Sequence, residues 1–139
     1  MKQAPRDRPS ARGLRVAIVR SLFNRPVTDG LLAGARQALA EMGADERRLR
    51  VFDLPGAFEL PLAAQAAALS GRFDAVVARE TGVPVAFGVL TVRQEEQARQ
   101  RAAAGPDNKG GEAARAAVMT ALALRAIPAP RPAARRRSR

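Results

Sequence analysis

The sequence predicts a doubly wound α/β domain built around a mainly parallel sheet of four strands. Short apolar runs of strand type alternate along the chain with segments of helical periodicity, which is the pattern of βαβ units. The length of 139 residues suits one domain with a single modest core, and no internal repeat is present. We therefore expect one α/β domain over residues 14–125, with a tail on either side.

Both tails are basic. Residues 1–13 contribute +3 and residues 126–139 contribute +5 to the net charge of +11, which leaves +3 for the segment between them. The tails are also rich in Pro, Ala and Ser, which predicts solvated, disordered ends. No aromatic stacking platform accompanies the arginines, so nucleic acid is not expected as a partner.

The first βα unit is expected at the start of the domain. Residues 14–19 form a short apolar strand, which Asn24-Arg-Pro-Val-Thr breaks. Thr28 is the expected N-cap of the helix that follows, and Gly43 ends that helix. Its apolar residues recur along one helical face, at Leu31, Leu32, Ala35, Leu39 and Met42.

The remaining elements follow the same alternation. A second strand is expected at 49–54, stopped by Pro55-Gly56, and an alanine-rich helix at about 59–69, closed by Ser70-Gly71. Thr91 and Gln94 form a capping-box pair before another helix, which ends near residue 103. The other expected elements are strands at 73–78 and 83–90, a loop at 105–111 and a final helix at 112–125.

The connection between the last two strands does not fit the parallel pattern. Only residues 79–82 separate them, whereas a parallel neighbour requires the chain to return about 17 Å, the full strand length. Parallel crossovers need about a dozen residues or more, usually with a helix. Either residues 79–82 turn an antiparallel hairpin, or the two runs form one long strand interrupted near Pro84. A crossover helix is missing from the expected fold.

Composition excludes several kinds of chemistry. The sequence has no cysteine and no histidine, which removes disulfides, thiolate nucleophiles, the usual zinc sites and the commonest general base near neutral pH. Aromatic side chains are limited to five phenylalanines. No apolar run approaches the roughly 18 residues of a membrane span, and no secretory signal is recognised at the N-terminus, so a cytoplasmic protein is expected.

Four blocks of the sequence resemble the lumazine synthase family, and they occur in the family's order. They are Val16-Ala-Ile-Val-Arg-Ser-Leu-Phe-Asn24 with Leu31-Leu-Ala-Gly-Ala35; Pro55-Gly-Ala-Phe-Glu-Leu-Pro61; Val83-Pro-Val-Ala-Phe-Gly-Val-Leu-Thr91; and Arg101 with Asn108-Lys-Gly110. The resemblance implies a flavodoxin-like fold that assembles into a homo-oligomer, a pentamer or a larger shell. It also implies condensation of 5-amino-6-ribitylamino-uracil with 3,4-dihydroxy-2-butanone 4-phosphate to 6,7-dimethyl-8-ribityllumazine, with no cofactor and no metal.

The resemblance also assigns roles to individual residues. Phe23 would stack on the pyrimidine ring, and Gly56, Ala57, Phe58 and Glu59 would hold the ribityl chain. From a neighbouring subunit, Phe87, Gly88 and Val89 would line the pocket, and Arg101 would pair with the phosphate, with Lys109 adding positive potential. Taken alone, Phe58 and Phe87 are more typical of core residues, Glu59 of a first helical turn, and Arg101 and Lys109 of solvated charges. The combined pattern favours the site.

One segment of the family pattern is absent. Family members continue their third strand into Gly-x-Val-Ile-Arg-Gly-x-Thr-x-His-Phe-Asp-Tyr-Val and a crossover helix, whereas Arg79 here runs directly into Glu80-Thr-Gly-Val-Pro-Val85. The chain thus lacks the family's histidine, so no catalytic residue is assigned. Asp107 also stands where the family usually has glycine. Two functions are expected: a lumazine synthase of reduced activity, or a non-catalytic homo-oligomeric assembly protein of the same family. A polyanion-binding protein that uses the basic ends is a third reading.

Overall fold

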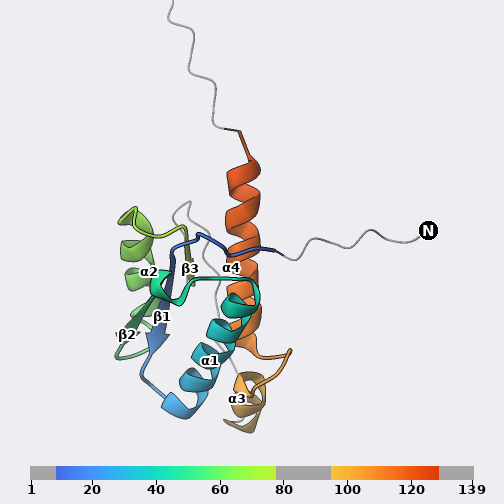
Figure 1. Ribbon diagram of the computed structural model, residues 1–139. Helices are drawn as coiled ribbons and strands as arrows, with labels where there is room; N and C mark the ends of the chain where they lie inside the picture. Colours follow the sequence, from blue (N-terminus) through green and yellow to red (C-terminus); the bar gives the residue numbers. More distant parts are fainter. Residues whose placement is uncertain (1–8, 78–94, 129–139) are drawn as a thin grey trace, which may run out of the picture.

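The computed structural model describes residues 9–77 and 95–128, which form a layered α/β domain (Figure 1). The expected strand at 83–90, the connection at 79–82, the Thr91–Gln94 pair and most of both tails lie outside these residues. In chain order the elements are β1 (Val16–Ser21), α1 (Arg25–Glu41), a 3₁₀ turn (Glu46–Arg48), β2 (Leu49–Leu54), α2 (Leu60–Leu69), β3 (Ala75–Val77), α3 (Glu95–Ala102) and α4 (Lys109–Ala126).

The described strands form one parallel sheet in the order β2-β1-β3. Val16 of β1 pairs with Leu49 on one side and with Ala75 on the other. The described strands are parallel because a crossover with a helix joins β1 to β2 and another joins β2 to β3. The central strand is buried along nearly its whole length because it is covered on both faces. The parallel α/β fold expected from the sequence is confirmed.

Helices cover the two faces of the sheet unequally. Side chains of β1 alternate between the faces: Val16 and Ile18 pack with α1 and α4, and Ala17 and Val19 pack with α2. Helices α1 and α4 lie side by side on their face (Figure 1). The core is therefore larger on the α1/α4 face than on the α2 face.

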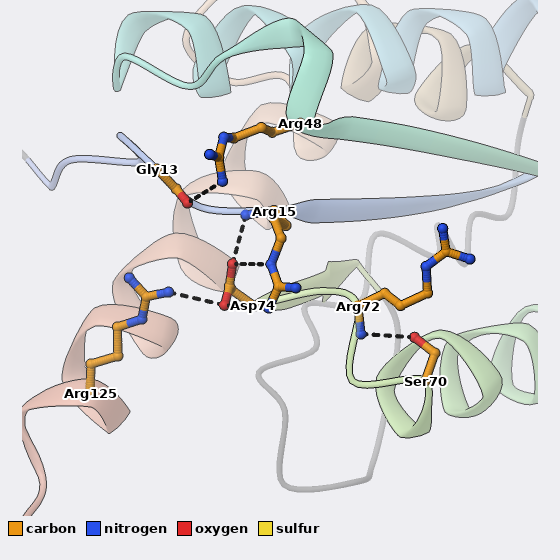
Figure 2. A network of polar contacts seen from close by, with 7 residues as sticks. All are labelled: Gly13, Arg15, Arg48, Ser70, Arg72, Asp74 and Arg125. Carbon is orange, nitrogen blue, oxygen red and sulfur yellow. Dashed lines mark hydrogen bonds and ion pairs between the residues drawn. The ribbon is translucent and has the colours of Figure 1, made fainter.

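Asp74, just before β3, ties the amino edge of the sheet together (Figure 2). Its carboxylate accepts hydrogen bonds from the backbone N–H of Arg15, at 2.8 Å, and from that residue's guanidinium. It also forms an ion pair with Arg125 of α4, at 3.0 Å. These bonds hold the pKa of Asp74 at about 2, with the guanidinium of Arg15 as the largest cause. The short strand β3 is thereby fastened to β1 and α4.

The first helix begins earlier than the sequence predicts. Its N-cap is Asn24, whose φ of 56° is left-handed and whose side chain makes no capping bond; Thr28 lies inside the first turn. Pro26 accounts for the shift, because its fixed φ suits the first helical positions, and asparagine tolerates the left-handed conformation before it. The expected N-cap at Thr28 is wrong, and the Thr28 hydroxyl is buried without a hydrogen-bond partner.

Other boundaries move by smaller amounts. The first strand lies two residues later than expected, and the last helix starts at Lys109, within the expected loop. The described structure also begins before residue 14, because Ala11 is fully buried and its N–H donates to Met42 O at 2.8 Å. Within residues 9–77 and 95–128, no helix is long and apolar enough to cross a membrane.

Candidate functional site

Two loops meet at the carboxyl edge of the sheet, where parallel α/β folds place their ligands. The last residues of β1 and β2, Ser21 and Leu54, are register partners, and the N–H of Leu22 donates to Leu54 O at 2.8 Å. The next residue, Phe23, has its N–H bonded to the Ser21 hydroxyl, and its side chain is 76% exposed. An aromatic ring is thus held at the strand ends without being used in the core.

The loop after β2 carries the four residues assigned to the ribityl chain. Phe58 is 98% exposed, so the reading of this side chain as a core anchor is wrong. Glu59 is the N-cap of α2, although its carboxylate makes no capping bond. A Cβ added to Gly56 would lie 2.8 Å from Glu59 Oε2, so glycine at position 56 leaves the space that the carboxylate occupies. The backbone therefore presents a ring and a carboxylate next to each other on the loop.

Arg20 fixes this edge, and the sequence analysis missed it. Its guanidinium forms a bidentate ion pair with Asp53 of β2, both bonds at 2.8 Å, and bonds Asp29 of α1 at 2.6 Å. The pair lowers the pKa of Asp53. The Arg20 side chain is only 14% exposed, although it follows four apolar residues of β1. One signal for this ion pair is present in the sequence. A basic residue, Arg20, stands near the end of an apolar strand, and an acidic residue, Asp53, stands at the corresponding place of the next strand.

The two cations assigned to the phosphate lie on a different part of the fold. Arg101 is exposed on α3, and Lys109 opens α4. Helix α3 packs against α1 through a small cluster of Val27, Ala98 and Ala102. The Lys109 ammonium bonds Glu112, which lowers the pKa of that carboxyl and offsets part of the lysine's positive charge. Phe87, Gly88 and Val89 lie outside the described residues.

Asn108 has a structural position that the resemblance did not foresee. The Asn-Lys-Gly run is not a loop before the last helix: Asn108 is the N-cap of α4, and its side-chain oxygen accepts from the N–H groups of Gly110 and Gly111. Asn108 is 2% exposed. Lys109 is consequently a first-turn residue of α4 rather than a loop lysine.

The described residues contain no group of three His, Cys, Asp or Glu side chains that could hold a metal ion. Because the sequence has no histidine, no imidazole is available as a general acid or base. The chemistry that remains at the carboxyl edge is stacking on a ring and hydrogen bonding to a carboxylate.

A parallel α/β sheet with exposed aromatic and acidic side chains at its carboxyl edge is typical of α/β domains that bind small molecules. A family model described as 6,7-dimethyl-8-ribityllumazine synthase matches residues 13–79 and 77–125. The chain belongs to this family, whose members act in riboflavin biosynthesis.

A curated relative gives the same result. The 6,7-dimethyl-8-ribityllumazine synthase of Chlorobium chlorochromatii (strain CaD3) is 37% identical over 136 residues, covering 78% of this chain and 88% of the relative. Since 78% of 139 residues is about 108, about 28 positions of the match have no counterpart here. The family match also falls into two pieces that meet at residues 77–79. Both findings agree with a segment missing after the third strand.

Proposed function

We propose that this chain condenses 5-amino-6-ribitylamino-uracil with 3,4-dihydroxy-2-butanone 4-phosphate to 6,7-dimethyl-8-ribityllumazine, at a reduced rate. Family membership supports the reaction. The main support from this chain is the pair of loops after β1 and β2, which a hydrogen bond joins at the carboxyl edge of the sheet. Phe23 is exposed on the first loop, and Glu59 lies beside Gly56 on the second.

In this proposal each loop binds one part of the uracil substrate. Phe23 stacks on the pyrimidine ring, and Glu59 accepts hydrogen bonds from ribityl hydroxyls, with Gly56, Ala57 and Phe58 lining the chain. A neighbouring subunit supplies Phe87, Gly88, Val89, Arg101 and Lys109. The exposure of Phe23 and Phe58 supports a shared site, because it leaves both rings open to contact with a substrate or a second subunit. We place the reaction in a cytoplasmic homo-oligomer, a pentamer or larger.

The reduced rate follows from the missing histidine. General acid–base help is worth about 10²–10⁴ in rate, and no other group of the sequence replaces an imidazole near neutral pH. Bringing two substrates together in a fixed geometry still accelerates a condensation substantially. Turnover is therefore expected above the uncatalysed rate and below that of relatives with the histidine.

A second candidate is a non-catalytic assembly protein of the same family. Large apolar side chains are exposed on α2 and α4, including Leu62 at 72%, Leu69 at 71% and Met119 at 57%. Such surfaces favour association with further copies of the chain, and association does not require the missing segment's chemistry.

The deciding experiment incubates the full chain with both substrates and follows the lumazine absorbance, together with particle size by light scattering. The matched variants are Phe23→Ala and Glu59→Gln at the site and Thr120→Ala on the exposed side of α4, where the hydroxyl bonds only its own helix. Product formation that falls at least about tenfold in the first two variants and stays unchanged in the third supports the enzyme. An assembled particle without product supports the second candidate.

A further inference from the structure

We propose that Asn108 is a positioning residue, whose buried amide holds α3 and thereby sets the place of Arg101 at the phosphate side of the site. The inference rests on the proposed function for the role of Arg101. The positioning itself rests only on the geometry of three helix ends.

The Asn108 amide joins three helices at once. The two hydrogens of its Nδ2 are shared among three carbonyl oxygens: Ala102 O at 2.8 Å and Ala103 O at 3.0 Å, at the carboxyl end of α3, and Gly30 O of α1 at 3.0 Å. Its Oδ1 accepts from the N–H groups of Gly110 and Gly111 at the start of α4, at 2.9 and 3.1 Å. One side chain therefore caps the end of one helix and the start of the next.

Helix α3 buries few of its own side chains. It is eight residues long with the sequence Glu-Glu-Gln-Ala-Arg-Gln-Arg-Ala, and only Ala98 and Ala102 are buried. Two alanine side chains bury little apolar area, so packing alone stabilises the docked position of α3 weakly. The Asn108 amide satisfies the carbonyl of the buried Ala102 at the carboxyl end of α3, and an unpaired buried carbonyl is costly.

The partner helices are shaped to receive this amide. A Cβ at Gly34 would lie 1.9 Å from Asn108 Oδ1, and one at Gly30 would lie 2.5 Å from Ala102 O. A Cβ at Gly110 would lie 1.8 Å from Leu31 O. These contacts are closer than any side chain permits, so the glycines of α1 and α4 allow the three helices to approach. The space between the three helices therefore fits an amide of the size of asparagine, because glycines line it.

The consequence for the site is geometric. Arg101 precedes Ala102, the residue whose carbonyl the amide holds most closely, and Lys109 follows Asn108 directly. A change at Asn108 that frees α3 moves Arg101 while Phe23 and Glu59, which are fixed at the sheet edge by β1 and β2, stay in place. Phosphate binding should therefore respond to Asn108 and uracil binding should not.

The test compares the full chain with Asn108→Ser, in which a serine hydroxyl keeps the cap of α4 but cannot bridge to three carbonyls. Thr120→Ala is the matched control. Hydrogen exchange of the amides of α3 and α4 reports the junction, and titrations with inorganic phosphate and with the ribitylamino-uracil alone report the two halves of the site. Arg101→Ala and the double variant show whether Asn108 acts through Arg101.

Faster exchange confined to α3, phosphate binding weaker by about tenfold and unchanged uracil binding support the proposal. In the Arg101→Ala background, Asn108→Ser should then change phosphate affinity by less than about twofold. Unchanged exchange in α3, equal loss of both ligands, or additive effects of the two substitutions would overturn it. If the unaltered chain binds no phosphate, the phosphate half of the proposed function fails, while hydrogen exchange in α3 still decides whether Asn108 holds that helix.

Discussion

The two faces of the sheet bury apolar side chains to very different extents. On the α1/α4 face, Leu14, Leu39 and Val118 are fully buried in one continuous cluster. On the α2 face the cluster consists mostly of alanine and valine, and α2 leaves Leu62 and Leu69 more than 70% exposed. Among residues 9–77 and 95–128, the α2 face is therefore the less completely covered of the two.

Crossover handedness explains which face is incomplete. In the strand order β2-β1-β3, the chain moves across the sheet in one direction from β1 to β2 and in the opposite direction from β2 to β3. Right-handed crossovers therefore place α1 and α2 on opposite faces of the sheet, as observed. A further parallel strand beyond β3 would continue in the second direction, so its crossover helix would lie beside α2. The segment missing after the third strand thus belongs to the α2 face, which is the incomplete one.

The largest expected effect comes from restoring that segment. Insertion between Arg79 and Glu80 of the family segment that carries the histidine and the crossover helix should raise product formation by about 10²–10⁴, because it returns the general acid–base group. It should also raise the free energy of unfolding, because it covers α2. Absorbance of the lumazine and urea denaturation measure the two effects.

The control is the same insertion with its histidine replaced by alanine. This variant should keep the gain in stability and lose the gain in rate. An insertion that stabilises neither α2 nor the whole chain would contradict the assignment of the missing helix to this face.

A smaller effect is expected when one leucine on each face is replaced by alanine and the free energies of unfolding are compared. Leu39→Ala should lower the free energy of unfolding by about 2–5 kcal/mol, because Leu39 is fully buried and truncation leaves a cavity. Leu69→Ala, at a side chain 71% exposed, should change it by less than about 0.5 kcal/mol. Urea denaturation of dilute protein measures both, and equal losses would mean that Leu69 is covered.

Asp74, at the amino edge of the sheet, gives the α1/α4 side of the molecule a contribution to the free energy of unfolding that depends on pH. Asp74 joins β3 to β1 and to α4 (Figure 2), and no ion pair of α2 is present among the described residues. Its pKa is lowered from 3.8 to about 2, so its stabilisation is complete above pH 4 and is lost as the pH falls toward 2. The unaltered chain should lose about 2 kcal/mol of unfolding free energy over that range relative to Asp74→Asn. Parallel pH dependence in both proteins would contradict this.

The sequence predicted what depends on local pattern and missed what depends on distant contacts. The strand at 49–54 and the helix near 59–69 follow from apolar runs and turn residues, and their expected bounds agree closely with the structure. The N-cap at Asn24 was missed because Pro26 decides it, whereas a threonine is the usual signal. The bonds of Arg20 to Asp53 and of Asn108 to Gly30 could not be predicted, since these partners lie 33 and 78 residues away.

The smallest expected effect tests whether the α2 face is covered by another copy of the chain. Leu62→Ser with Leu69→Ser should change the unfolding free energy of the dilute, unassociated chain by less than about 1 kcal/mol, because both side chains are already largely in water. At high concentration the same pair should reduce particle size in light scattering if copies associate through this face. The control for a general change in solubility is the double variant Arg47→Ser with Arg50→Ser, at two exposed polar positions. Particle size that falls only in the leucine variant would show that association compensates for the missing helix, and unchanged size would place the contacts between copies elsewhere.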